Sequence, residues 1–238
     1  MINRLTRPLV LSLSLAVIGV FAPLTVSAMD AGVQTAATQA ALTPAAALQK
    51  LKDGNKRFLA GDMQNRDLMA QVKATSTGQF PHSIVLSCID SRVPPELVFD
   101  QGLGDIFAPR VAGNYVDTDM LGNMEFGAAV AGSKLIVVLG HSECGAVKGA
   151  CDNVKLGNLT HTLTNLAPAV YEVTDVPGER SSKNAAFVDA VAHKNVNLMV
   201  DNILTRSPTL AGLVDEGKLM VVGAMYNVGT GTVTFMDE

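Results

Sequence analysis

The sequence feature that most constrains the fold is the apolar run KLIVVLG at residues 134–140. It does not alternate between apolar and polar residues, which is typical of a strand that is covered on both faces. A shorter run of the same kind, SIVLS at 83–87, predicts a second buried strand. We expect further strands at 105–111, 218–228 and 232–236, and helices that begin near residues 43, 95, 118, 144 and 184. Strands that alternate with helices predict an α/β fold, with a mostly parallel central sheet flanked by helices.

The first 28 residues have the layout of a secretory signal peptide. Arg4 and Arg7 precede an apolar segment at 9–24, and small residues at 26–28 (VSA) offer a cleavage site. The apolar segment is shorter than the ~20 residues that a membrane span needs, and it contains a proline. We therefore predict that the chain is exported, most simply to the periplasm.

The mature chain is expected to begin with a linker. Residues 29–42 carry small and weakly polar side chains and predict a flexible tether. Thr43 and Pro44 then suit the cap and first turn of a helix that ends near Gly61. Because no repeat or internal boundary is visible, we expect residues 43–238 to form a single domain.

Composition excludes several kinds of partner. The chain is 48% hydrophobic and 17% charged, as an ordinary globular protein is. Its net charge is −4 and it has no basic run, so neither nucleic acid nor an anionic membrane surface is an expected partner. In an oxidising compartment cysteines pair as disulfides, but three cysteines cannot all pair with one another. Either one thiol is free, or another kind of bond occupies them.

Chemically reactive side chains follow both buried strands. Cys88 comes directly after the strand at 83–87, and His141 and Cys144 follow the strand at 134–140. The carboxyl ends of parallel strands meet at one edge of a sheet, so these three residues can converge there. Two thiolates and an imidazole are ligands that zinc prefers, and three protein ligands with an open fourth position are typical of a catalytic zinc site. A helix that begins at Cys144 also favours the thiolate form of that residue.

Each of these residues alone has an ordinary interpretation. A cysteine at a strand end is usually a small buried hydrophobe, and a single histidine is usually a hydrogen-bonded structural residue. The combination favours a metal, and it leaves only Cys151 spare, as a buried structural thiol. The other histidines have no motif around them, so we expect surface or capping roles for His82, His161 and His193.

The stretches CIDSR at 88–92 and HSEC at 141–144 together resemble the β-class carbonic anhydrases. The similarity extends through VPPE at 93–96, QGLGDIFAPRVAGN at 101–114 and VVLGHSECGAVKGA at 137–150. The resemblance implies one zinc ion per chain on Cys88, His141 and Cys144, and a functional pair formed by Asp90 and Arg92. It also implies the reversible hydration of CO2 to bicarbonate and a proton, by attack of a zinc-bound hydroxide on CO2.

The resemblance also assigns roles around the metal. Zinc lowers the pKa of its bound water from 15.7 to about 7. Asp90 is either a fourth zinc ligand, in a closed state, or an acceptor for the zinc-bound water, and Arg92 can hold it off the metal in a bidentate pair. Gln101 resembles the family glutamine that reaches into the substrate pocket.

One branch of the family carries a non-catalytic bicarbonate pocket built from a Trp, an Arg and a Tyr. Arg110 and Tyr226 match two of these positions, but Val85 stands at the third and the chain contains no Trp. Because valine cannot supply the indole N–H donor, we predict an open site in which Asp90 is paired to Arg92. A simpler role for Arg110, holding neighbouring backbone at a strand end, predicts the same open site.

Other functions stay open at this point. A zinc protein without turnover is disfavoured by Asp90 and Arg92, and a thiol redox protein by the absence of a C-x-x-C pair. A hydrolase of CS2 or COS that uses the same zinc hydroxide is not distinguished from a carbonic anhydrase. The resemblance further implies a homodimer or larger homo-oligomer, with an N-terminal helical arm at 43–60 that reaches across to its partner.

Overall fold

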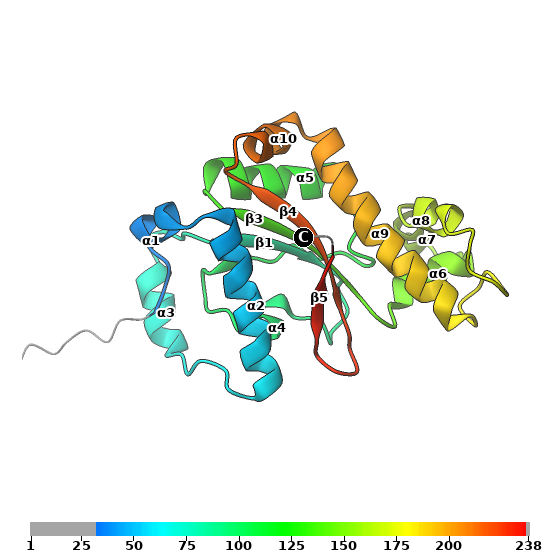
Figure 1. Cartoon of the computed structure of the whole chain (residues 1–238), viewed down its shortest axis with the longest axis horizontal. Helices are drawn as coiled ribbons and strands as arrows, with labels where there is room; N and C mark the ends of the chain where they lie inside the picture. Colours follow the sequence, from blue (N-terminus) through cyan, green and yellow to red (C-terminus); the bar gives the residue numbers. More distant parts are fainter. Residues whose placement is uncertain (1–31, 237–238) are drawn as a thin grey trace, which may run out of the picture.

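A computed structural model describes residues 32–236, so the predicted signal peptide and the first residues of the predicted tether lie outside the described residues. Five strands form one sheet in the order β2-β1-β3-β4-β5 (Figure 1). The strands are β1 (Ser83–Ser87), β2 (Ile106–Phe107), β3 (Leu135–His141), β4 (Met220–Tyr226) and β5 (Val233–Phe235). All neighbouring pairs are parallel except β4 and β5. The prediction of an α/β fold with a mostly parallel sheet is confirmed.

Helices pack around this sheet, and α6, α7 and α8 gather beside one end of the long helix α9 (Figure 1). The helices are α1 (Ala36–Ala41), α2 (Pro44–Ala60), α3 (Leu68–Thr75), α4 (Pro95–Val98), α5 (Thr118–Glu125), α6 (Gly145–Cys151), α7 (Leu159–Thr164), α8 (Ala167–Glu172), α9 (Ala185–Arg206) and α10 (Pro208–Asp215). Helix α5 continues into a π-helical turn, η1 (Phe126–Val130), so the predicted helix at 118–132 is present with a wider last turn. Among residues 32–236, none of the helices has the length and apolar character needed to cross a bilayer.

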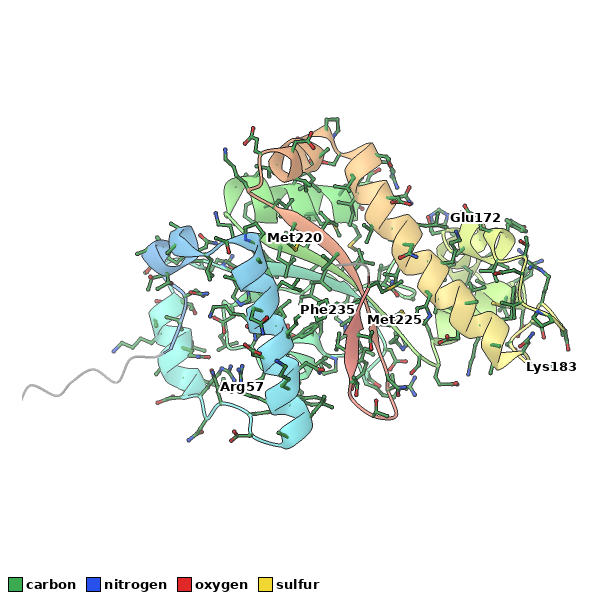
Figure 2. All side chains as sticks on the ribbon, in the orientation of Figure 1. Arg57, Glu172, Lys183, Met220, Met225 and Phe235 are labelled. Carbon is green, nitrogen blue, oxygen red and sulfur yellow. The ribbon has the colours of Figure 1, made fainter. Side chains whose placement is uncertain are left out.

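The sheet separates two hydrophobic layers. Along β1 and β3, Val85 and Val137 face helices α2 and α4, whereas Leu86 and Val138 face α9. All seven residues of β3 are buried, as expected for a strand that is covered on both faces. Figure 2 shows side chains filling both layers, with Met220 and Met225 along β4 and Phe235 on β5.

The predicted tether is wrong for residues 36–41, which form helix α1. Thr35 caps this helix, and its side chain accepts a hydrogen bond from the backbone N–H of Thr38. Gln39 is buried, and its Nε2 donates to the carbonyl oxygens of Pro81 and Ala131, at 2.8 Å each. The two hydrogen bonds of the Gln39 amide join this segment to residues 42 and 92 positions along the chain. The composition of the segment does not indicate these contacts.

Helix α2 begins and ends as predicted. The Thr43 side chain accepts from the N–H of Ala46, Pro44 occupies the first turn, and Gly61 ends the helix in the left-handed region at φ 67°. Leu48 and Leu51 of α2 are buried in the layer beneath this chain's own sheet. The helix at 43–60 therefore packs on this chain's own sheet, and its predicted reach across to a partner stays a prediction.

Strand β2 is shorter than the predicted segment at 105–111. It pairs with β1 only through Ile106 and Phe107. Pro109 has no N–H to donate to a strand ladder, and β1 contacts resume when Ser87 donates to the Pro109 carbonyl at 3.1 Å. The segment that follows therefore runs beside the end of β1, where Cys88 lies.

Candidate metal centre

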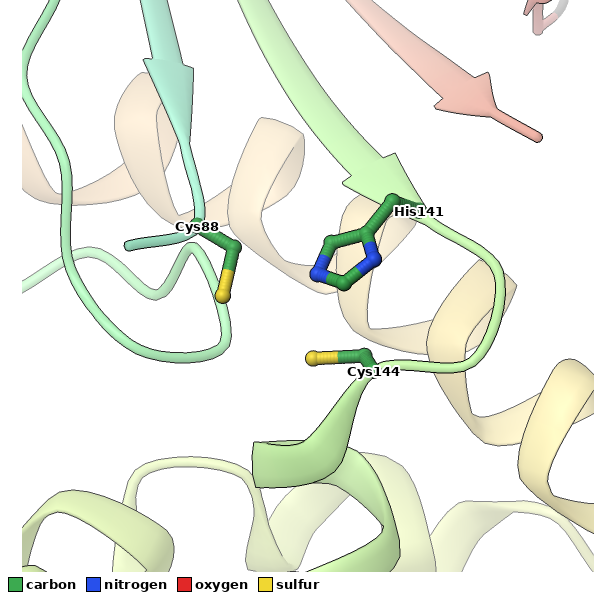
Figure 3. A group of neighbouring side chains, drawn as sticks. All are labelled: Cys88, His141 and Cys144. Carbon is green, nitrogen blue, oxygen red and sulfur yellow. The ribbon is translucent and has the colours of Figure 1, made fainter. Parts of the chain in front are cut away.

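Cys88, His141 and Cys144 come together at the carboxyl edge of the sheet. Figure 3 shows Cys88 leaving the end of β1, His141 at the end of β3 and Cys144 just before α6, with their side chains directed toward one another. One ligand atom from each residue lies within 4.8 Å of the others. All three side chains are at most 4% exposed. Parallel pairing of β1 with β3 places the two strand ends side by side, which explains how residues 53 positions apart meet.

The ring of His141 is held in the form that binds a metal. Nδ1 lies 2.8 Å from the carbonyl oxygen of Ser142. A carbonyl can only accept, so Nδ1 carries the proton and Nε2 has a free lone pair. Nε2 is buried and has no hydrogen-bond partner among the described residues. A buried polar atom without a partner is costly, and a metal ion shared with the two thiols would satisfy it.

A hydrogen bond links the thiols of Cys88 and Cys144. The hydrogen bond from Cys144 lowers the pKa of Cys88, and the N–H of Gly113 lowers it further, although burial opposes both. The same bond to Cys88, together with burial, raises the pKa of Cys144. The N–H groups of Ala146 and Val147 at the start of α6 lower the pKa of Cys144, as expected, whereas the bond to Cys88 and burial raise it.

Asp90 and Arg92 form the planar pair that the resemblance implied. Arg92 Nε donates to Asp90 Oδ1 at 2.9 Å, and Nη2 donates to Oδ2 at 2.8 Å. The backbone N–H of Arg92 also donates to Oδ1. The Arg92 side chain holds the pKa of the Asp90 carboxyl well below its usual range. Both carboxylate oxygens are thus occupied by Arg92, which is the arrangement predicted for an open site.

Arginine side chains also tie the two ligand-bearing loops together. Arg110 Nε donates to the carbonyl oxygen of Cys88 at 2.8 Å, and its Nη2 donates to that of Asp90 at 2.6 Å. Arg92 Nη2 reaches the carbonyl oxygen of Glu143 at 3.5 Å. Arg110 therefore has the simpler of its two predicted roles, holding backbone at the strand end.

A cavity of about 230 Å³ lies beside the cluster. His141 and Cys144 line one side of it, and Val188 and Ala192 of α9 line another. Both α9 residues are only 5% exposed, so they present an apolar wall near the ligand atoms. A larger cavity, of about 350 Å³, lies among α6, α7 and α8 around Cys151, away from the cluster.

Within this chain, Gln101 does not reach the cluster of Cys88, His141 and Cys144. Its Oε1 lies 2.9 Å from Nε2 of His82, and its Nε2 donates to the carbonyl oxygen of Phe99 at 2.5 Å. His82 directly precedes β1, whereas Cys88 directly follows it. Six residues of extended chain span about 20 Å, so Gln101 lies at the opposite edge of the sheet.

The structure also changes the interpretation of other singled-out residues. His82 was expected at the surface or in a cap, but it is 1% exposed and its ring nitrogens contact Ser83 and Gln101. Burial lowers the pKa of His82, although the bond to Gln101 opposes this. Cys151 is half-buried, and burial raises its pKa to about 11, which fits an unreactive structural thiol. His161 and His193 lie on helices α7 and α9, outside the cluster.

One hydrogen-bond donor to the metal centre, a backbone N–H group, was not predicted from the sequence. The backbone N–H of Gly113 donates to Cys88 Sγ at 3.3 Å. This glycine has φ 83°, in the left-handed region, and a Cβ there would lie 2.6 Å from Leu166 Cδ1. The glycine in AGN at 112–114 could have suggested a turn, but not the thiol that it faces.

Comparison with known proteins places the chain in a family. The carbonic anhydrase family model matches residues 83–233. Carbonic anhydrase 2 of Mycobacterium tuberculosis is 35% identical over 201 residues, covering 82% of this chain and 94% of the relative. This chain belongs to the β-class carbonic anhydrases. The carbonic anhydrase of Mycolicibacterium smegmatis is 37% identical over 193 residues, covering 80% of this chain and 92% of the relative.

The fold comparison agrees. The β-carbonic anhydrase CafA of Aspergillus fumigatus superposes with a TM-score of 0.63 at 26% identity, covering 81% of this chain and 90% of that one. The family resemblance found in residues 88–92 and 141–144 is confirmed, and so is the prediction of a carbonic anhydrase enzyme.

Proposed function

We propose that this chain catalyses the reversible hydration of CO2 with one zinc ion held by Cys88, His141 and Cys144. The observation that carries the proposal is the buried cluster itself, in which three ligand atoms of the types that zinc prefers lie within 4.8 Å of one another. The buried Nε2 of His141 supports it, since it has no hydrogen-bond partner among the described residues and a zinc ion would satisfy it. The family to which the chain belongs supports the same reaction.

The donor set fits zinc rather than a harder ion. Two thiolates and an imidazole suit zinc, whereas magnesium and calcium prefer oxygen ligands. When bound, zinc acts as a Lewis acid that lowers the pKa of a water molecule to about 7 and so supplies hydroxide at neutral pH. Three protein ligands leave a fourth position free for this chemistry.

Asp90 and Arg92 orient the reacting water in this proposal. Hydration joins a water oxygen to the carbon of CO2 and releases one proton. The Asp90 carboxylate, which stays ionised at neutral pH because Arg92 holds it, can accept a hydrogen bond from the attacking water. The same pairing restrains Asp90 from taking the fourth position on the metal.

We also propose that the chain is exported and that it forms a homo-oligomer. Export rests on the signal-like layout of residues 1–28. Assembly is supported by apolar side chains of α3 that are exposed in the single chain, with Leu68 at 55%, Met69 at 73% and Val72 at 47%. Light scattering on the purified protein tests assembly, and a monomer at micromolar concentration would contradict it.

A mutant pair tests the proposed catalysis. In stopped-flow CO2 hydration, Asp90→Asn should retain zinc but lose about 100-fold in rate or more. The neutral amide is a weaker hydrogen-bond acceptor for the reacting water than the carboxylate, and it cannot form the same two-bond pair with Arg92. Arg92→Lys should be slower than wild type and faster than Arg92→Ala, because lysine keeps the charge but lacks the planar fork. Asp119→Asn, an exposed aspartate on α5, is the matched control. Equal hydration rates in all four proteins and wild type would show that the pair is only structural.

A further inference from the structure

One residue on the buried face of α9 is polar. Asn195 is 1% exposed, and its buried neighbours on the helix, Val191, Val196 and Met199, are apolar. Asn195 Nδ2 donates to the carbonyl oxygen of Gly113 at 3.0 Å, while its Oδ1 has no partner among the described residues. Burying an amide costs free energy unless its hydrogen bonds are made, so an apolar side chain would pack here at less cost. Core packing alone therefore does not explain Asn195.

The contact partner of Asn195 lies in a turn against the metal centre. Asn114 N–H donates to the carbonyl oxygen of Val111 at 2.9 Å and closes the turn, and Val111 N–H donates to Ser87 at 3.0 Å. These bonds fasten the turn to the end of β1. Within this turn, the backbone N–H of Gly113 donates to Cys88 Sγ, at 3.3 Å. Gly113 thus accepts from α9 on one side and donates to the proposed metal ligand on the other.

A glycine in the left-handed region needs an outside anchor. It has no side chain to restrict its backbone, so several directions of its N–H are open to it. The bond from Asn195 fixes the peptide that follows Gly113 and limits those directions. An N–H donor to a ligand sulfur stabilises the thiolate and orients it, and such supporting contacts commonly change metal affinity by 10- to 100-fold.

We propose that Asn195 is a positioning residue for the metal centre, which acts through Gly113 to hold an N–H donor on the Cys88 thiolate. This inference rests on the proposed zinc site. It assigns a role in metal retention to a residue on a helix that carries none of the metal ligands. Asn195 itself does not touch the ligand atoms, and its effect passes through the two peptide units that Gly113 joins.

The test measures zinc retention. Asn195→Leu keeps the branched shape and the number of side-chain heavy atoms but removes the donor, and zinc should pass from it to a chromophoric chelator about 10-fold faster than from wild type. Ile203→Val is the matched control, because Ile203 is also fully buried on α9 but lies two turns further along the helix. Its rate of zinc loss should equal that of wild type. Equal rates for wild type, Asn195→Leu and Ile203→Val would overturn the proposal.

A second variant and a second readout cover the case in which Asn195→Leu does not fold. Asn195→Ser is smaller and should also lose zinc faster than wild type. In wild type loaded with a spin-half isotope of cadmium, NMR should detect a coupling between the metal and the Gly113 amide proton through the N–H···S bond, and the coupling should weaken in the serine variant. An undiminished coupling, or unchanged zinc loss in the serine variant, overturns the role of Asn195. A wild-type chain that binds neither metal overturns the proposed zinc function instead.

Discussion

Replacing Gly113 by alanine should destabilise the protein through two separable effects. The residue has φ 83°, and the left-handed region costs an alanine roughly 1–2 kcal/mol. The new methyl group would also lie 2.6 Å from Leu166 Cδ1 and 2.9 Å from Cδ2, and Leu166 is fully buried. Overpacking of this kind costs about 1–3 kcal/mol, so the sum is about 2–5 kcal/mol.

Gly61→Ala is the matched control for the backbone effect. Gly61 has φ 67°, and a Cβ there would meet nothing within 4 Å. Gly61→Ala should therefore lower the free energy of unfolding only by the cost of placing an alanine in the left-handed region, roughly 1–2 kcal/mol. Urea denaturation of both metal-free variants, followed by circular dichroism, gives the two free energies of unfolding. The reasoning fails if Gly113→Ala is destabilised no more than Gly61→Ala, within the ~0.5 kcal/mol spread of ordinary surface changes.

Two further predictions concern the ion cluster beneath α2 and the N-terminus. Asp100 is fully buried and accepts from Arg57 and Arg66, so Asp100→Asn should lower the free energy of unfolding by about 3–5 kcal/mol in urea denaturation. Burial raises the pKa of Asp100, but the bonds from the two arginines lower it overall. The contribution of Asp100 to the free energy of unfolding is therefore complete above about pH 4 and is lost as the pH falls further. If the free energy of unfolding fell equally steeply with pH in wild type and in Asp100→Asn, this prediction would be contradicted. Removing residues 1–28 should leave a folded, zinc-binding protein that stays in the cytoplasm, whereas loss of folding in circular dichroism would show that the segment belongs to the fold.

The parts of the fold that could be predicted from sequence are those with a strong local pattern. Strands β1 and β3 are continuous apolar runs, and α2 carries its cap and its stop signal in Thr43 and Gly61. The convergence of Cys88 with His141 and Cys144 followed from one further rule, that parallel strands end at a common edge. These features need no knowledge of distant contacts.

Several of the errors concern contacts between distant residues. Helix α1 is fixed by Gln39 reaching two carbonyl groups far along the chain, and nothing in its own sequence predicts that anchor. His82 is buried and contacts Gln101, 19 positions along the chain, so it does not have the surface role expected of it. Asn195 escaped notice for the same reason, because a polar residue in a helix is ordinary until its burial is known.

The most direct test of the central claim is zinc content measured together with CO2 hydration, in wild type and in Cys144→Ser. The account predicts about one zinc per wild-type chain and hydration that depends on it, with both strongly reduced in the variant, because the cluster then lacks one of its three ligands. Hydration by wild type that survives complete removal of zinc would contradict the account. So would a Cys144→Ser protein that keeps its zinc and its full rate.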